Sequence, residues 1–545
     1  MTSRFLSHPP AVAGSVARDP ADPVIATRSL IALALGLGVL ALWPLAVFPH
    51  PGMLDYPNHL ARAFILGRLD DPLLAAHYRA VWTLVPNLGF DLWMLALDPL
   101  IGLDNAARLF IALAPILTTV GVFALAWTIH RRITPLQLLA LPLIYNSAFT
   151  KGFLGFNMSM GIALIAAACW QGLGERRAGL RLFIATLFST LLYVVHLGGF
   201  GAYGIWVAGT RLRDLWLCRA DPAARRTWLL TTARDATQVI PVGALLILGR
   251  LAPVEPTTFD TTSRGFEIPP VRLAQIETLM DIGPVWLTAP PLVILIGFLV
   301  LALTTRRLAI APIVAVPVAI SLVLFFALPN TFQGIYFAAW RALFVAACFL
   351  IAGLTPTAGF GRGTLLLLTA CLTVVLAFAS IVTAGYWDET RRARADVLEI
   401  LAPIPDGSRV FFAQTDRRTR SGKRAAANLY HVTAHAVISK RILLQFLFTN
   451  PTQQPLRFVD DAIQSAPDHS SNTLGDALRT FKRDARPFPP HLDRFDYILT
   501  QGADDPRQFD LMWGRDIEVI ARVGGYWLAR PGRLIDQAPA NVPPR

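Results

Sequence analysis

Long apolar stretches separated by short polar ones make up most of the first 385 residues. A helix that crosses a membrane needs about 20 predominantly apolar residues, with roughly 17–25 as the working range. Stretches 134–149 and 236–251 are the shortest that we include. The pattern predicts a polytopic α-helical membrane protein with about 11 transmembrane helices, at residues 29–48, 106–129, 134–149, 152–173, 180–197, 199–216, 236–251, 285–304, 308–328, 340–358 and 364–384.

Composition supports this class. Hydrophobic residues make up 54% of the 545-residue chain and charged residues only 16%. A soluble domain carries about 25% charged residues, so an ordinary soluble enzyme is excluded, as are disordered and fibrous proteins. The net charge of +13 would point to nucleic acid in a soluble protein. In a membrane protein such an excess collects in cytoplasmic loops, so we expect no nucleic-acid partner.

The basic residues predict the orientation. With the N-terminus inside, arginine-rich connections at residues 130–132, 175–181, 211–226, 306–307 and 362 all fall on the cytoplasmic side. The odd number of spans then places the C-terminus outside. We therefore expect a multi-pass protein of the inner (plasma) membrane. Its expected parts are a cytoplasmic tail (1–28), a transmembrane domain (29–385) that includes the first outer loop (49–105), and an extracytoplasmic, periplasmic domain (386–545).

The region after residue 385 reads as a small α/β domain. Helices are expected at 387–401 and 429–447, and strands at 409–413, 497–500 and 526–529, with a turn at Gly524 and Gly525.

The first outer loop holds the main candidate for chemistry. Asp55 lies just before Pro57, a residue that favours the first turn of a helix, so Asp55 should stand at the positive end of the helix dipole. That position would keep the carboxylate ionised and able to accept a proton. The plain alternative is an N-cap aspartate, and one side chain can serve both roles. Residues 88–101 read as a helix in the membrane interface, with Asp91 and Asp98 on one face.

Further polar groups collect on the same side of the membrane as Asp55. Ionisable groups at membrane depth are costly and are functional candidates by default, although a lysine or arginine there can also snorkel to the interface. The expected substrate-binding set comprises Tyr56, Asn58, His59, Arg62, Asp91, Tyr145, Asn146, Lys151, His196, Arg264 and Arg341.

Two apparent motifs carry less weight. The glycines at 199, 201 and 204 match a dinucleotide-binding pattern, but they open an apolar span instead of following a strand. His431 and His435 have helical spacing without the glutamate of a metalloprotease motif or an evident third ligand. We expect a surface or packing role for both histidines and no protein metal site.

Residues 54–110 resemble the GT-C superfamily of integral membrane glycosyltransferases. The resemblance comprises Asp55 soon after the first span, a stretch from Pro86 and Asn87 through Trp93 and Leu95, and Gly102 followed by Ala107 and Arg108. It implies transfer of a hexosyl or pentosyl unit from a polyprenyl-phosphate donor to an envelope glycan, lipid or protein acceptor on the outer face, with Asp55 as the residue that acts as the base or orients the acceptor. Many members carry a second acidic residue beside the first, where this chain has Tyr56. Whether a divalent cation takes part in the reaction is therefore left open.

The chemistry can also be argued from the residues. A lipid phosphate is a good leaving group, so such a transfer needs a base for the acceptor hydroxyl and a cation for the departing phosphate. Asp55 could supply the first, and Lys151, His196, Arg264 or Arg341 the second. A transporter or flippase of lipid-linked glycans and a non-catalytic membrane scaffold are the alternatives. Sugar, acceptor, carrier length, stereochemistry and oligomeric state cannot be read from the sequence.

Overall fold

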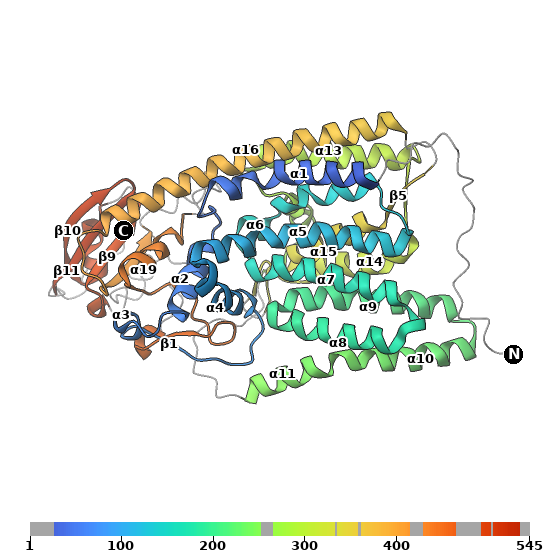
Figure 1. Cartoon of the computed structure of the whole chain (residues 1–545). Helices are drawn as coiled ribbons and strands as arrows, with labels where there is room; N and C mark the ends of the chain where they lie inside the picture. Colours follow the sequence, from blue (N-terminus) through green and yellow to red (C-terminus); the bar gives the residue numbers. More distant parts are fainter. Residues whose placement is uncertain are drawn as a thin grey trace.

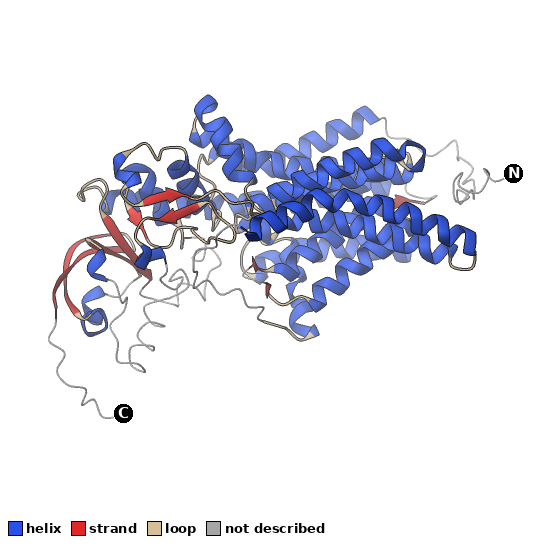
Figure 2. Ribbon diagram, turned by 90° about the horizontal axis from the view of Figure 1, so that it is seen from below, coloured by secondary structure: helices blue, strands red, loops and turns tan. Residues whose placement is uncertain are grey.

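The computed structural model describes residues 27–251, 265–332, 335–357, 361–414, 429–464, 492–502 and 505–534. Within these residues a bundle of long helices carries, at one end, a smaller domain that contains a mixed β-sheet (Figures 1 and 2). Helix α16, near the edge of the bundle in Figure 1, continues out of it and reaches the sheet.

The bundle is built from apolar helices, as the hydrophobic pattern predicts. They are α1 (Thr27–Val47), α5 (Leu103–His130), α7 (Leu154–Leu173), α8 (Ala178–Val195), α9 (Leu197–Cys218), α11 (Ile240–Leu251), α13 (Val285–Thr304), α14 (Ala315–Ala327), α15 (Ala338–Gly353) and α16 (Arg362–Ile400). Among the described residues, six helical segments are long and apolar enough to cross a membrane, and two further apolar helices are shorter. The multi-span class is therefore supported, whereas the count of eleven and the N-in/C-out orientation stay predictions.

One expected span is not a regular helix. Residues 134–149 form three short helical turns, η1 (Pro135–Ala140), η2 (Pro142–Tyr145) and α6 (Ser147–Thr150), of which the first two begin at prolines. Every residue from 134 to 149 is buried. Irregular backbone at membrane depth is tolerated where protein surrounds it and its polar groups find partners there. The expectation of a transmembrane helix is wrong here because each proline removes a backbone N–H donor that a continuing helix would use.

The irregular segment is needed because α5 and α7 run parallel. Gly161 lies against Leu117, and Gly172 lies against Thr128, so both helices advance in the same direction. A Cβ added at Gly161 would come 2.6 Å from the Leu117 Cβ, so the glycine permits this close helix contact. The chain between α5 and α7 must therefore return along the length of the bundle, and residues 134–149 make that return.

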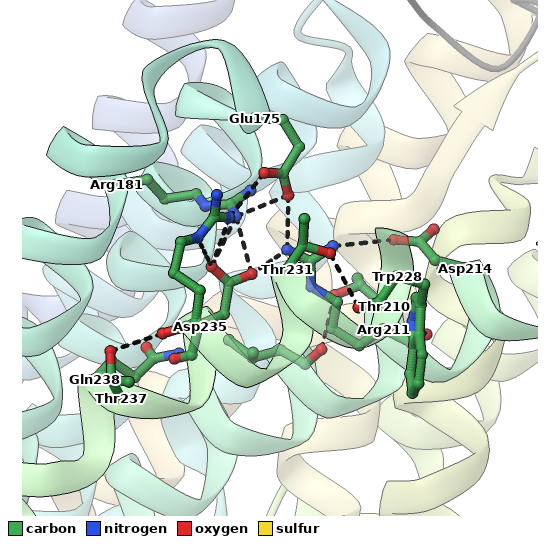
Figure 3. Close-up of polar contacts among 12 residues, drawn as sticks. Glu175, Arg181, Thr210, Arg211, Asp214, Trp228, Thr231, Asp235, Thr237 and Gln238 are labelled. Atoms are coloured by element: carbon green, nitrogen blue, oxygen red, sulfur yellow. Dashed lines mark hydrogen bonds and ion pairs between the residues drawn. The ribbon is translucent and has the colours of Figure 1, made fainter. Parts of the chain in front are cut away.

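A partly buried ion network joins three helices (Figure 3), at the end of the bundle away from the C-terminal domain (Figure 1). Asp235, at the end of α10 (Pro222–Ala236), accepts from Arg181 of α8 at 2.9 Å and from Arg234 at 2.8 Å, and it also contacts Arg211 of α9. Glu175 accepts from the same three arginines at 2.7–2.8 Å. Each carboxylate thus faces three guanidinium groups, and the network holds α8, α9 and α10 together.

This network predicts that two substitutions lower the stability of the protein by different amounts. Asp235→Asn breaks the buried pair with Arg181 and leaves Glu175 to face the three arginines alone, so we expect a loss of about 3–5 kcal/mol in stability. Asp214→Asn is the matched control, because Asp214 is 44% exposed and its arginine contacts are 3.5–3.7 Å long, which makes a surface pair worth about 0–1 kcal/mol. Thermal unfolding of the two variants in detergent should separate them; equal melting temperatures would contradict a structural role for the network.

The C-terminal domain contains a five-stranded mixed sheet with strand order β10-β11-β9-β6-β7. Strand β6 pairs in parallel with β7 and β9, whereas β9, β11 and β10 pair antiparallel. The strands are β6 (Arg409–Gln414), β7 (Leu443–Leu444), β9 (Tyr497–Gln501), β10 (Arg515–Val523) and β11 (Tyr526–Leu534). The three expected strands are confirmed, Gly524 has the positive φ of 55° that suits a turn, and β10 was not expected.

Of the two helices expected in this domain, one is present and the other is not. Residues 387–401 are helical, but as the continuation of α16, so the expected boundary at 385/386 lies inside one helix. The expected helix 429–447 is wrong. It breaks into η7 (Val432–Ala434), α19 (His435–Lys440) and β7, and Arg441 at φ 49° ends α19 in the left-handed region.

The first outer loop packs with the C-terminal domain as much as with the bundle. Strand β1 (Tyr78–Ala80) pairs with β8 (Leu456–Phe458), and every residue of α2 (Tyr56–Leu66) is buried. A helix is present where residues 88–101 predicted one, as α4 (Gly89–Ile101), and its place in the membrane interface stays a prediction. The remaining short elements are α3 (Pro72–Ala75), η3 (Glu175–Arg177), η4 (Thr237–Val239), α12 (Pro269–Ala274), η5 (Gln275–Leu279), β2 (Leu308–Ile310), η6 (Pro312–Val314), β3 (Thr331–Phe332), β4 (Ile335–Tyr336), β5 (Leu354–Pro356), α20 (Asp461–Gln464), η9 (Leu492–Arg494), η10 (Pro506–Phe509) and α22 (Asp510–Trp513).

Candidate functional site

Asp55 lies at the start of α2, where the bundle meets the C-terminal domain. It occupies the N-cap position, but its side chain makes no capping hydrogen bond, so the plain N-cap explanation does not account for the carboxylate. Its backbone N–H donates to the Lys151 carbonyl at 2.9 Å. Its Oδ1 lies 3.5 Å from Nε2 of His431, a residue 376 positions further along the chain.

Burial changes the protonation of this carboxylate. The loss of solvent raises the pKa of Asp55 to about 7, and the nearby charges of Lys151 and Arg341 oppose that rise. We expected the helix dipole to keep the group fully ionised, and that expectation is wrong because desolvation outweighs the favourable charges. A carboxylate with a pKa near the working pH is suited to take up and release a proton.

Gly152 allows the chain to approach Asp55 closely. It has a φ of +78°, and a Cβ there would lie 3.0 Å from the Tyr56 nitrogen and 3.2 Å from the Asp55 nitrogen. A side chain at this position would be strained and would crowd the start of α2. The glycine thus lets the end of the irregular segment, including Lys151, lie against Asp55.

Two cations face Asp55 from surroundings rich in aromatic rings. Lys151 Nζ lies 5.3 Å from the ring centre of Phe337 and 5.6 Å from that of Trp340. The Arg341 guanidinium lies 4.9 Å from the ring centre of Phe153, and its Nη1 is 3.1 Å from Nε2 of His196. These are cation–π distances, and the rings keep water away while they stabilise the cations.

A small cavity opens beside Arg341. The lining combines one guanidinium group with aromatic rings and the short polar side chains of the irregular segment. It is formed by Asn146, Ser147, Ala148, Phe153, Phe156, Thr278, Phe337, Trp340, Arg341 and Phe344. Phe337 adopts a left-handed φ of 59°, which is uncommon for a bulky residue and occurs often at functional sites.

His431 is the site residue that the sequence interpretation missed. The amide oxygen of Asn58 accepts from the Phe448 N–H at 2.8 Å, which fixes the orientation of the amide. The Nδ2 of Asn58 then donates to the Phe446 carbonyl at 2.9 Å and lies 3.2 Å from Nδ1 of His431. Since Nδ1 accepts, the proton of neutral His431 lies on Nε2 and points at Asp55. The expected surface position is wrong for His431, which is only 5% exposed, whereas the expected packing role is supported, because its ring packs against the rings of Phe446 and Phe448.

The other residues predicted to bind substrate lie partly at this site and partly in the packing around it. His59 is buried between the rings of Phe90 and Phe448, and Asn146 caps α6 with an oxygen that accepts from the Phe149 N–H at 3.1 Å. Tyr145 donates to the Ala41 carbonyl of α1. Tyr56 faces His50 and His435 instead of Asp55, and Arg264 lies outside the described residues. Substrate contact by any of these residues stays a prediction.

Arg62 and Asp91 are bound to each other. Arg62 donates to Asp91 through Nε at 2.8 Å and through Nη2 at 3.1 Å, and both side chains are completely buried. Burial raises the pKa of Asp91, and the charge of Arg62 opposes the rise. The pair joins α2 to α4 and so fixes the helix that begins at Asp55.

The described residues contain no group of three or more His, Cys, Asp or Glu side chains placed to hold a metal ion. The divalent cation left open by the sequence is not tested by that observation.

Breaking the Arg62–Asp91 pair should destabilise the protein by about 3–5 kcal/mol, because the remaining charge stays buried without its partner. Arg62→Met is the single variant, and Arg62→Met with Asp91→Leu replaces both charges by apolar groups of similar size. We expect the double variant to recover most of the lost thermal stability in detergent. A double variant no more stable than the single one would contradict this account of the pair.

Comparison with known proteins gives a likeness to solved structures. No protein-family model and no curated protein sequence matches the chain. Among solved structures, ArnT from Cupriavidus metallidurans in the apo state and the same protein bound to undecaprenyl phosphate are each 11% identical to the chain. Each match covers 92% of this chain and 97% of ArnT, with TM-scores of 0.49 and 0.48 respectively. The functional assignment therefore has to come from the residues of this chain.

Proposed function

We propose that this protein is a membrane glycosyltransferase of the GT-C type. It moves a sugar from a polyprenyl-phosphate donor to an envelope glycan, lipid or protein acceptor on the outer face of the membrane. The observation that carries the proposal is the largely buried carboxylate of Asp55, 16% exposed, whose pKa desolvation raises to about 7 against the nearby charges of Lys151 and Arg341. The resemblance of residues 54–110 to GT-C enzymes supports the same class. The undecaprenyl phosphate in the ArnT structure is itself a polyprenyl phosphate, but the supporting residues are this chain's own.

The proposed reaction is a direct displacement at the anomeric carbon. The acceptor hydroxyl attacks that carbon, its proton passes to Asp55, and the bond from the anomeric carbon to the phosphate oxygen breaks with its electron pair on the phosphate. Lys151 and Arg341 stabilise the phosphate as it departs, and the planar guanidinium can donate two hydrogen bonds to it. No acid is needed, because a phosphate leaves without protonation.

His431 has a positioning role in this proposal. Its Nε2–H points at Oδ1 of Asp55, which leaves the other carboxylate oxygen for the acceptor. Because His431 belongs to the C-terminal domain and Asp55 to the first outer loop, the base is oriented only when the two parts are docked. A transporter or scaffold would have no need for this arrangement, and no contact of the described residues favours either alternative.

Asp55→Asn should abolish transfer and leave the protein folded. Removal of a general base costs roughly 10²–10⁴-fold in rate. The amide also avoids placing a charge in a buried position, so we expect an unchanged or higher melting temperature at pH 8, where Asp55 is ionised. Mass spectrometry of envelope glycolipids and polysaccharides should show the same missing sugar increment in Asp55→Asn cells as in deletion cells, at matched protein level.

Asp70→Asn is the matched control, because it removes an exposed carboxylate from the same loop. Its products should equal those of the wild type. If Asp55→Asn cells kept the sugar increment that the deletion loses, the transferase proposal with Asp55 as base would be wrong.

The pH profile should follow the carboxylate. Since only the deprotonated base accepts a proton, transfer rates should rise with pH, with a midpoint near 7, and fall about tenfold per unit well below it. Desolvation raises this midpoint, and the charges of Lys151 and Arg341 lower it. We expect His431→Phe to raise the midpoint and lower kcat more than KM, because the Nε2–H that lies 3.5 Å from Oδ1 no longer stabilises the ionised carboxylate electrostatically.

His431→Gln provides the conservative comparison, since its amide can still donate. Initial rates in membranes between pH 5.5 and 8.5 should place it between the wild type and His431→Phe. Equal profiles for all three proteins would contradict the positioning role of His431.

A further inference from the structure

A second cavity lies beside Tyr56, on a different set of residues from the Asp55 site. It encloses about 330 Å³, near the lower end of ligand pockets. It is formed where the first outer loop, the start of α5, α16 and the C-terminal domain meet, and it is lined by His50, Gly102, Leu103, Asp104, Asn105, Arg394, His435, Ile438 and Ser439. None of these residues has a role in the proposed transfer.

Hydrogen-bond donors dominate this cavity. The first turn of the 28-residue helix α5 lines it, and no side chain caps that turn at Gly102. The positive end of such a helix, with its free N–H groups, favours anions. Arg394 adds a full positive charge from α16, and its buried Nε has no hydrogen-bond partner in the described part of the chain.

Two histidines give independent support for a ligand. His435 lines the cavity and is only 3% exposed, yet its Nδ1 has no hydrogen-bond partner among the described residues. The Nδ1 of His50 also lacks one, and the two rings are 5.0 Å apart. Buried polar atoms without partners are rare, because each costs about 1–3 kcal/mol, so a bound group is the natural partner.

Asp104 is the one carboxylate of the lining. It is half exposed and lies 3.9 Å from His50 Nδ1. The charges of Arg394, Asp104 and Arg108 all influence His50 electrostatically, so the cations near this histidine outnumber the carboxylate. The local balance of charge therefore favours an anionic ligand.

We infer that the cavity formed by His50, Arg394, His435 and the start of α5 binds a phosphate group. Arg394 and the N–H groups of α5 donate to its oxygens, and the two imidazoles complete the set of partners. In a transferase the group belongs to a phosphorylated acceptor; this assignment rests on the proposed function, whereas phosphate binding does not. The ring of Tyr56 lies next to His50 and His435, and Tyr56 follows Asp55 directly in the chain, so the cavity and the proposed base adjoin the same helix start.

The test measures binding to the full-length protein, purified in detergent, without any transfer assay. Line broadening in ³¹P NMR reports binding of inorganic phosphate and of glucose 6-phosphate. Thermal stabilisation in mixed micelles reports binding of phosphatidic acid, compared with phosphatidylcholine. Binding of the soluble phosphates indicates a glycan or free phosphate as the source, and binding of phosphatidic acid alone indicates a lipid headgroup.

Arg394→Gln should weaken, at least tenfold, the binding of whichever phosphate probe the wild type binds, and His435→Gln should also weaken it. Arg391→Gln is the matched control, because it removes an exposed arginine of the same helix that pairs with Asp388, and it should bind as the wild type does. A wild-type protein that binds none of the phosphates, or equal binding by Arg394→Gln and Arg391→Gln, would overturn the inference. Binding should persist in Asp55→Asn, so failure of the transferase proposal stays distinguishable.

Discussion

The burial of α2 between the helical bundle and the C-terminal domain is the constraint on which the rest of the structure depends. The amide of Asn58 makes this contact specific, since one side chain reaches the Phe446 carbonyl, the Phe448 N–H and the imidazole of His431. A buried amide that lost these partners would cost about 1–3 kcal/mol for each unsatisfied group. The same contact fixes the His431 tautomer and brings its Nε2–H to Asp55. Docking of the domain therefore places His431 beside the carboxylate.

The charged side chains at the two ends of the bundle have different surroundings. At one end, Glu175 and Asp235 are each surrounded by Arg181, Arg211 and Arg234, so the charges compensate one another within the fold. At the other end, Asp55 faces Lys151 and Arg341 among aromatic rings, beside a cavity that Arg341 lines. In a medium that excludes water, electrostatic interactions are stronger than at the surface. The first arrangement stabilises a structure, and the second is suited to a charged reactant.

The irregular segment between α5 and α7 connects the packing of the bundle to this site. Glycines let the two helices approach closely in parallel, which obliges the chain to return through the protein interior. Short helical turns can do so because their polar groups find partners there, as the capping box at Thr134 and the cap at Asn146 show. The segment ends at Lys151 and Gly152, directly against Asp55. The position of a site cation therefore follows from the way in which two apolar helices pack.

The sequence by itself determined the membrane class, most of the helices, three strands of the sheet and the place of Asp55 at a helix start. These features follow from local patterns: runs of apolar residues, alternation along strands, and Pro57 after the aspartate. It could not determine that Asp55 is buried enough to raise its pKa to about 7. Nor could it show that Arg62 and Asp91 satisfy each other, or that His431, 376 residues away, lies 3.5 Å from Asp55. Desolvation and long-range contacts depend on which surfaces meet, so only the tertiary structure decided them.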